Sequence, residues 1–110
     1  MTRGEPWTDE ENEAIVDAYF SMLELELSGR PFVKAEVRRE LQTGALRKRS
    51  HASIDFKFRN ISGVLEDYEQ LWIEGYKPAF NYQAELERAV VAKREARGVQ
   101  LPPKHVRERG

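Results

Sequence analysis

The chain has 110 residues, of which 40% are hydrophobic and 34% are charged, and it contains no cysteine. This length favours a single domain with one core, and the lack of cysteine excludes disulfides and thiolate metal sites. No apolar run approaches the roughly 18 residues needed to cross a bilayer, and the first residues lack the apolar core of a signal peptide. We therefore expect a soluble, cytoplasmic protein with no membrane partner.

The net charge of -1 conceals separate bands of charge along the chain. Residues 1–30 carry two basic and eight acidic side chains, whereas residues 31–60 carry eight basic and three acidic ones. A positive band can attract a polyanion even when the whole molecule is close to neutral. The alternative is that the acidic and basic bands neutralise one another within the same fold.

A first helix is predicted over residues 9–28. Thr8 and Glu11 have the spacing of a capping box, and Gly29 is suited to end the helix in the left-handed conformation. Apolar residues form two adjoining stripes, which indicates a wide buried face. The outer side of this helix is acidic, so it is a poor candidate for contact with nucleic acid.

A short second helix is predicted over residues 33–42, after the break imposed by Pro31. Val33, Val37 and Leu41 share one face at helical spacing, and the opposite face is basic. Residues 43–45 end this helix, and a longer amphipathic helix follows. That order resembles a helix-turn-helix, although the connection is longer than the three or four residues of the strict motif.

The long helix belongs to the stretch from residue 47 to residue 68, RKRSHASIDFKFRNISGVLEDY. A basic cluster comes first, and Ser50 is placed to be the N-cap. The apolar residues of one face follow at steps of four and three, and they are Ile54, Phe58, Ile61, Leu65 and Tyr68. This face must be buried.

The outward side of the same helix holds Ser53, Phe56, Arg59 and Asn60, with Lys57 near the edge of the apolar stripe. A large aromatic residue outside the core side has two explanations. Phe56 packs under another helix or a terminal segment, or it faces a ligand together with its polar neighbours. The basic cluster just upstream favours a ligand that carries phosphates.

Aromatic residues are concentrated in a loop over residues 71–83, and we expect them to pack onto the helices rather than to form a platform for stacking bases. A last helix is predicted over residues 82–97, with Asn81 as its cap. Together these elements predict an all-α protein, a compact bundle of about four helices with a helix-turn-helix-like central pair. Residues 1–97 are expected to form the domain, and residues 98–110 a linker or disordered tail.

No catalytic or cofactor site is indicated. His51 and His105 lack a second ligand at metal spacing, and the sequence has no Gly-rich phosphate loop, nucleophile elbow or His-Asn-His pattern. Glu36 and Glu40 form a pair of the kind that is common on solvated helices. We expect no metal and no cofactor, and we expect the module by itself not to be an enzyme.

The segments WTDEE, AYFSMLELELSGR, RSHASIDFKFRNISGVL and IEGYKPAFNYQ resemble a helical module at the N-termini of bacterial restriction-type proteins. The most distinctive parts are residues 54–57, residues 60–62 and residues 75–78. In those proteins the module precedes a nuclease or nuclease-like domain, including HNH endonucleases. The resemblance implies a targeting or accessory domain in defence against foreign DNA, with a nuclease domain beyond residue 110, and it assigns no catalytic residue.

The residues and the resemblance together predict a DNA-binding module in which basic side chains neutralise phosphates and Asn60, assisted by Ser53, reads bases. The predicted nucleic-acid-binding residues are Lys34, Arg38, Arg39, Arg47, Lys48, Arg49, Ser50, Ser53, Phe56, Lys57 and Asn60. The alternative is a protein-interaction or oligomerisation domain, in which the acidic face of the first helix meets a basic band on another copy or partner. A third possibility is that the module binds another part of its own chain.

Overall fold

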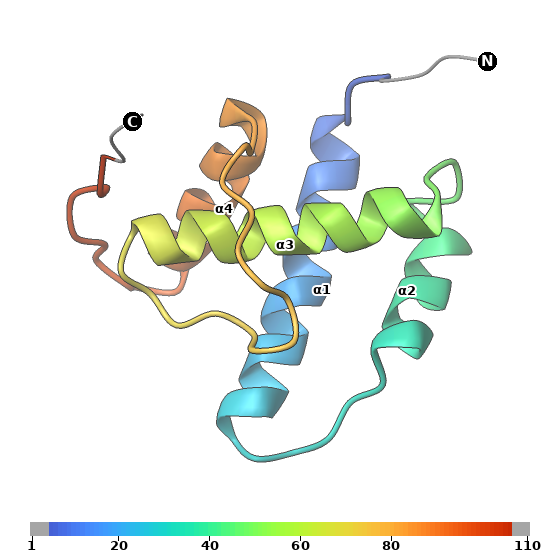
Figure 1. Cartoon of the computed structure of the whole chain (residues 1–110), viewed down its shortest axis with the longest axis horizontal. Coiled ribbons are helices and arrows are strands. Elements are labelled where there is room, and N and C mark those ends of the chain that lie inside the picture. Colours follow the sequence, from blue (N-terminus) through green and yellow to red (C-terminus); the bar gives the residue numbers. More distant parts are fainter. Residues whose placement is uncertain (1–4, 107–110) are drawn as a thin grey trace.

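A computed structural model describes residues 5–106, which form four α-helices and no β-strand. The helices are α1 (Asp9–Leu27), α2 (Lys34–Gln42), α3 (His51–Asp67) and α4 (Ala84–Ala96). α3 runs across α1, with α2 on one side of α1 and α4 on the other (Figure 1). The predicted all-α bundle of about four helices is confirmed.

α1 begins and ends as its local sequence predicts. The backbone N–H of Glu11 donates to the hydroxyl of Thr8 at 3.1 Å, and the backbone N–H of Thr8 donates to the carboxylate of Glu11 at 2.9 Å. This reciprocal pair is the capping box. At the other end, Gly29 has a φ of 71°, which a residue with a side chain rarely adopts.

α2 is held less firmly than the other helices, since none of its residues is fully buried. It packs against α1, and the connection of residues 43–50 is anchored by the fully buried Leu46. Two hydrogen bonds join α2 to the start of α3: Arg38 to the ring of His51 at 3.1 Å, and the side-chain amide of Gln42 to the carbonyl of Arg49 at 3.1 Å. The predicted order of a short helix, a turn and a longer helix is present, and the connection between α2 and α3, residues 43–50, is longer than the turn of the strict motif.

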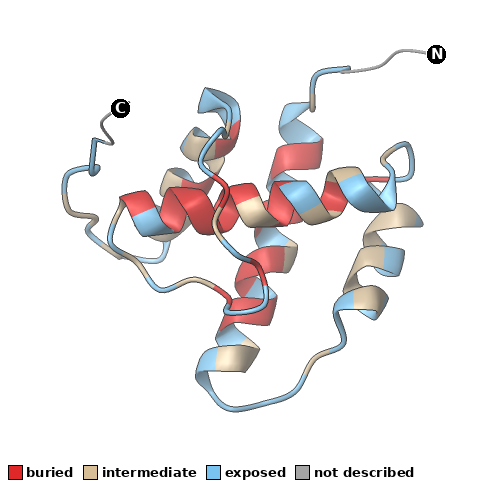
Figure 2. Ribbon diagram, in the orientation of Figure 1, coloured by how far each residue is buried: buried red, intermediate tan, exposed pale blue. Residues whose placement is uncertain are grey.

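α3 is the centre of the core. Ile54, Phe58, Ile61 and Leu65 are buried as the apolar stripe predicts, and they pack against buried residues of α1 and α4. The C-terminal half of α3 is buried on nearly every side, whereas its first two turns keep an exposed face (Figure 2). The N-terminal half of α3 therefore offers the larger exposed surface to a partner.

The loop between α3 and α4 covers the C-terminal half of α3. Tyr76 is buried and Trp72 and Tyr82 are partly buried, as predicted for the aromatic residues of this loop, whereas Phe80 remains 40% exposed. Tyr82 belongs to the loop and not to the last helix, and its hydroxyl donates to Asp67 at 2.8 Å. α4 begins at Ala84 with Gln83 as its N-cap, rather than at residue 82 with Asn81 as its cap.

The segment after α4 returns to the helices. Lys104 pairs with Glu87 at 3.0 Å, and the backbone N–H of His105 donates to the carbonyl of Asp67 at 2.7 Å. Residues 98–106 are therefore attached to the helical domain, which corrects the predicted boundary after residue 97. Residues 1–4 of the predicted domain and residues 107–110 of the predicted tail lie outside the described residues.

Candidate nucleic-acid interface

Five of the predicted phosphate-binding residues belong to one short stretch of the chain, α2 and the turn that follows it. Lys34, Arg38 and Arg39 belong to α2, and Arg47 and Lys48 belong to the turn that follows it. The C-terminal end of α2 and this turn lie next to the N-terminal end of α3 (Figure 1). Arg38 is half-buried and the other four are exposed. We call these five residues the basic edge.

The basic edge keeps its positive charge available. The ion pairs among residues 5–106 involve other cations, namely Arg49, Lys93, Arg97 and Lys104. Within the basic edge, Lys34 donates to the carbonyl of Gly75 at 3.1 Å, and Arg47 donates to the carbonyl of Gly44 at 3.2 Å. Neutral carbonyl groups orient these side chains without cancelling their charge, so the cations remain able to attract an anion.

Arg49 does not belong to this surface, which corrects one predicted contact. Its guanidinium donates to both carboxylate oxygens of Glu11, at 2.7 and 2.8 Å, and also to the carbonyls of Glu5 and Pro6. The hydrogen bond from Arg49 is the main reason why the pKa of Glu11 falls to about 2. All three guanidinium nitrogens are occupied within the protein, so Arg49 stabilises the fold and is not available to a phosphate.

Lys57 is also removed from the predicted interface. Only 8% of the residue is exposed, and its ammonium lies 4.7 Å from the ring centroid of Trp7. The guanidinium of Arg49 lies against the same ring, at 4.9 Å. Burial lowers the pKa of Lys57, and the nearby positive charge of Arg49 adds to the effect. The segment before α1 covers this side chain, and helical periodicity within α3 could not indicate that.

Asn60 is not the base reader that the sequence suggested. It is only 3% exposed, and its side-chain amide donates to the carbonyl of Ala79 at 3.0 Å. The neighbouring N–H of Ala79 donates to the carbonyl of Arg59 at 3.0 Å. The loop between α3 and α4 therefore crosses α3 at this point, and Asn60 fastens the two together.

Two further residues of this part of α3 hold the same loop. A Cβ added to Gly63 would lie 2.3 Å from the carbonyl oxygen of Ala79, so the close crossing requires glycine. The hydroxyl of Ser62 is hydrogen-bonded to that of Tyr19 at 2.7 Å, and the Tyr19 oxygen also accepts from the N–H of Ile73 at 2.8 Å. The segment of residues 60–63 is thus explained by packing.

The exposed face of α3 is short and lies next to the basic edge. Ser50 caps the helix by accepting from the N–H of Ser53 at 3.1 Å, as predicted. Ser53 is half-buried, and Phe56 is 40% exposed, so the explanation in which another helix or a terminal segment covers Phe56 does not hold. The guanidinium of Arg59 lies 5.8 Å from the Phe56 ring centroid.

Two residues of this face were not among the predicted contacts. His51 is the first residue of α3, is exposed, and is hydrogen-bonded to Arg38. Arg59 lies three residues after Phe56 on the same helix. The sequence contained a signal for each contact: His51 follows the basic cluster directly, and Arg59 lies on the outward side of the helical wheel. Their inclusion gives the exposed face one aromatic ring, an imidazole and an additional cation.

Residues 5–106 contain no group of three or more histidine, aspartate or glutamate side chains that could hold a metal ion. No helix in the same range has the length and apolar character needed to span a bilayer.

Comparison with known proteins identifies no relative. No family model, no curated protein and no solved structure matches the chain. The resemblance to the helical module of restriction-type proteins therefore stays a prediction.

Proposed function

We propose that this chain is a DNA-binding or targeting module of a bacterial restriction or phage-defence protein. The observation that carries the proposal is that the turn with Arg47 and Lys48 and the end of α2 lie next to the half of α3 that keeps an exposed face. Cations around the N-terminal end of a helix can hold phosphates while the first turns of that helix reach a groove.

The contacts divide by chemistry. The basic edge neutralises phosphates, and the capped N-terminus of α3 adds the partial positive charge of its helix dipole. Ser53 and Phe56 face the bases, where a hydroxyl can donate or accept and an aromatic ring can contact a thymine methyl group. Arg49, Lys57 and Asn60 support this surface from within the fold. The restriction-type context rests on the resemblance, which also favours a nuclease domain elsewhere in the full-length protein.

The test measures affinity for a labelled DNA duplex at several salt concentrations. Each neutralised phosphate contributes roughly -0.9 to the slope of log affinity against log salt. The double variant Arg47→Ala/Lys48→Ala should therefore bind more weakly, with a slope that is flatter by about 1.8 units. Both side chains are exposed and neither forms an ion pair in the described structure, so the fold should keep its stability.

The matched control is Arg30→Ala/Arg88→Ala. It removes the same charge from exposed positions outside the basic edge. The control should leave the salt slope unchanged. Equal slopes for the two double variants, or no measurable affinity for DNA at low salt, would refute the proposal.

A second candidate is a protein-interaction or oligomerisation module that makes no contact with nucleic acid. The exposed ring of Phe56 favours it, because aromatic residues are enriched at the centres of protein interfaces. This candidate predicts a molar mass that rises with concentration in light scattering, and a return to the monomer mass in Phe56→Ala. A constant monomer mass together with salt-dependent DNA binding favours the first candidate.

A further inference from the structure

The residues that precede α1 lie against one side of α3. The guanidinium of Arg49 donates to the carbonyls of Glu5 and Pro6 at 3.0 and 2.9 Å. The ring of Trp7 is partly buried and contacts two cations, with the guanidinium of Arg49 at 4.9 Å and the ammonium of Lys57 at 4.7 Å from its centroid. We call residues 5–7 the strap.

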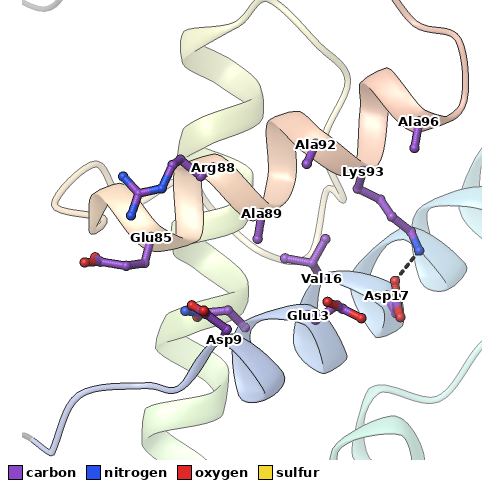
Figure 3. Close-up of a pocket in the computed structure, with 11 residues that line it drawn as sticks. Asp9, Glu13, Val16, Asp17, Glu85, Arg88, Ala89, Ala92, Lys93 and Ala96 are labelled. Atoms are coloured by element: carbon purple, nitrogen blue, oxygen red, sulfur yellow. Dashed lines mark hydrogen bonds and ion pairs between the residues drawn. The ribbon is translucent and has the colours of Figure 1, made fainter.

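The ammonium under the strap has no counter-charge of its own. Lys57 is only 8% exposed, and it forms neither a hydrogen bond nor an ion pair with the described residues. The nearby carboxylate of Glu11 is taken by Arg49, whose own positive charge repels Lys57. Glu85 also attracts Lys57, but it is exposed and lies one turn of α4 from Arg88 (Figure 3). A buried charge without a partner is costly, so an anion that reached Lys57 would stabilise it.

Lys57 borders the surface that we propose for DNA. It lies one turn after Ser53, and residues four apart share one side of a helix. Ser53 belongs to the face of α3 that remains partly exposed beside the basic edge. Trp7 and a phosphate on that face would therefore compete for the same ammonium.

We propose that the strap is an autoinhibitory contact, which a nucleic-acid phosphate displaces from Lys57. This inference rests on the nucleic-acid proposal. In the closed state Trp7 covers the ammonium, and in the bound state the strap has left α3 and Lys57 donates to the phosphate. A ligand shifts such an equilibrium by binding one state more tightly, and the added phosphate contact supplies that difference. Arg49 keeps its ion pair with Glu11 in both states, so α1 stays in place.

The first test is the salt dependence of affinity for a labelled DNA duplex. Lys57→Gln should flatten the slope of log affinity against log salt by about 0.9, because one phosphate contact is lost. A residue that stays covered in the complex would leave the slope unchanged, and that result would overturn the proposal. The matched control is Lys93→Gln, which removes a half-buried lysine that pairs with Asp17 on α1. The slope of this control should equal that of the wild type.

The second test removes the competitor of the phosphate. Trp7→Ala should bind the duplex about threefold more tightly, since the cation–π contact that holds the strap closed is lost. Its salt slope should stay the same, because the bound state is unchanged. Trp72→Ala removes the other tryptophan, which is partly buried outside the strap, and should give no gain in affinity. Equal affinities of Trp7→Ala and the wild type would contradict the inference.

The third test follows the strap directly and does not depend on the folding of Trp7→Ala. Trp72→Phe leaves Trp7 as the single tryptophan of the chain. Saturating DNA should raise the acrylamide quenching of its fluorescence about twofold, since the ring leaves α3 when the duplex binds. Quenching that stays constant or falls would show that the strap remains closed.

Failure of the strap and failure of the nucleic-acid proposal give different results. If neither the wild type nor Trp7→Ala binds DNA at low salt, the nucleic-acid proposal is refuted and the strap with it. If the wild type binds with a salt-dependent affinity, but Lys57→Gln keeps the same slope and Trp7 keeps the same quenching, only the strap is refuted.

Discussion

The guanidinium of Arg49 donates to both carboxylate oxygens of Glu11, at 2.8 and 2.7 Å, and so joins the turn after α2 to the first turn of α1. The same guanidinium holds the carbonyls of Glu5 and Pro6 and lies against the ring of Trp7. Arg49, the last residue of the basic cluster, therefore joins two parts of the fold. It positions the basic edge without contributing to its charge.

Loss of charge at Glu11 should destabilise the protein. Glu11→Gln should lower the free energy of unfolding at pH 7 by about 2 kcal/mol, because the mostly buried Arg49 loses its counter-charge. Glutamine can still complete the capping box with Thr8, so the change isolates the ion pair. Chemical denaturation measures the effect, and Glu10→Gln, on the exposed side of α1, serves as the control and should change stability little.

The same pair should make stability depend on pH at the acidic end. The pKa of Glu11 is about 2 in the folded protein and 4.5 in its ordinary state, so the unfolded chain binds the proton first as pH falls. The stabilisation is complete above about pH 4.5 and is lost as pH falls toward 2. Unfolding curves at pH 7, 4 and 3 should show a smaller decline for Glu11→Gln than for the wild type. Parallel declines would contradict the assignment.

Gly63 should tolerate no side chain. An added Cβ would meet the carbonyl oxygen of Ala79 at 2.3 Å, and this oxygen is backbone that also accepts from Asn60. Gly63→Ala should therefore lower the free energy of unfolding by about 3 kcal/mol or more, since the loop must move away from α3. Gly44→Ala is the matched control, because its Cβ would approach no atom closer than 3.8 Å. A stable Gly63→Ala protein would contradict the close crossing.

Asn60 should matter for stability and not for the choice of DNA sequence. Asn60→Ala leaves the Ala79 carbonyl without the amide that donates to it, and a loss of about 1 to 3 kcal/mol is expected. The preference of the Asn60→Ala variant among DNA duplexes should equal that of the wild type. Ser53→Ala, on the exposed face, should keep normal stability and change the preference among duplexes. Binding assays on a set of duplexes, combined with thermal unfolding, separate the two roles.

The hydroxyl of Tyr19 should contribute more to the free energy of unfolding than the hydroxyl of Tyr76 does. Tyr19→Phe leaves the Ile73 N–H and the Ser62 hydroxyl without their partner in the core, which should lower the free energy of unfolding by about 1 to 3 kcal/mol. Tyr76 is equally aromatic and buried, but its hydroxyl forms no hydrogen bond in the described structure. Tyr76→Phe should therefore change stability little. Equal effects would show that ring packing, and not hydrogen bonding, is responsible.

The sequence alone determined the features that depend on neighbours along the chain. The capping box at Thr8, the N-cap at Ser50 and the apolar stripe from Ile54 to Leu65 are local patterns, and the structure confirms each of them. They rest on hydrogen bonds and side-chain periodicity within a few residues. The helix count and the all-α class follow from them.

Only the tertiary structure decided which polar residues of α3 remain exposed. Helical periodicity placed Asn60 and Lys57 away from the centre of the apolar stripe, yet the loop at Ala79 covers the first and Trp7 covers the second. Arg49 likewise donates a hydrogen bond to Glu11, which lies 38 positions earlier in the sequence. The period of one helix describes its own faces, but the segments that cover those faces come from distant parts of the chain and are fixed only when the whole core packs.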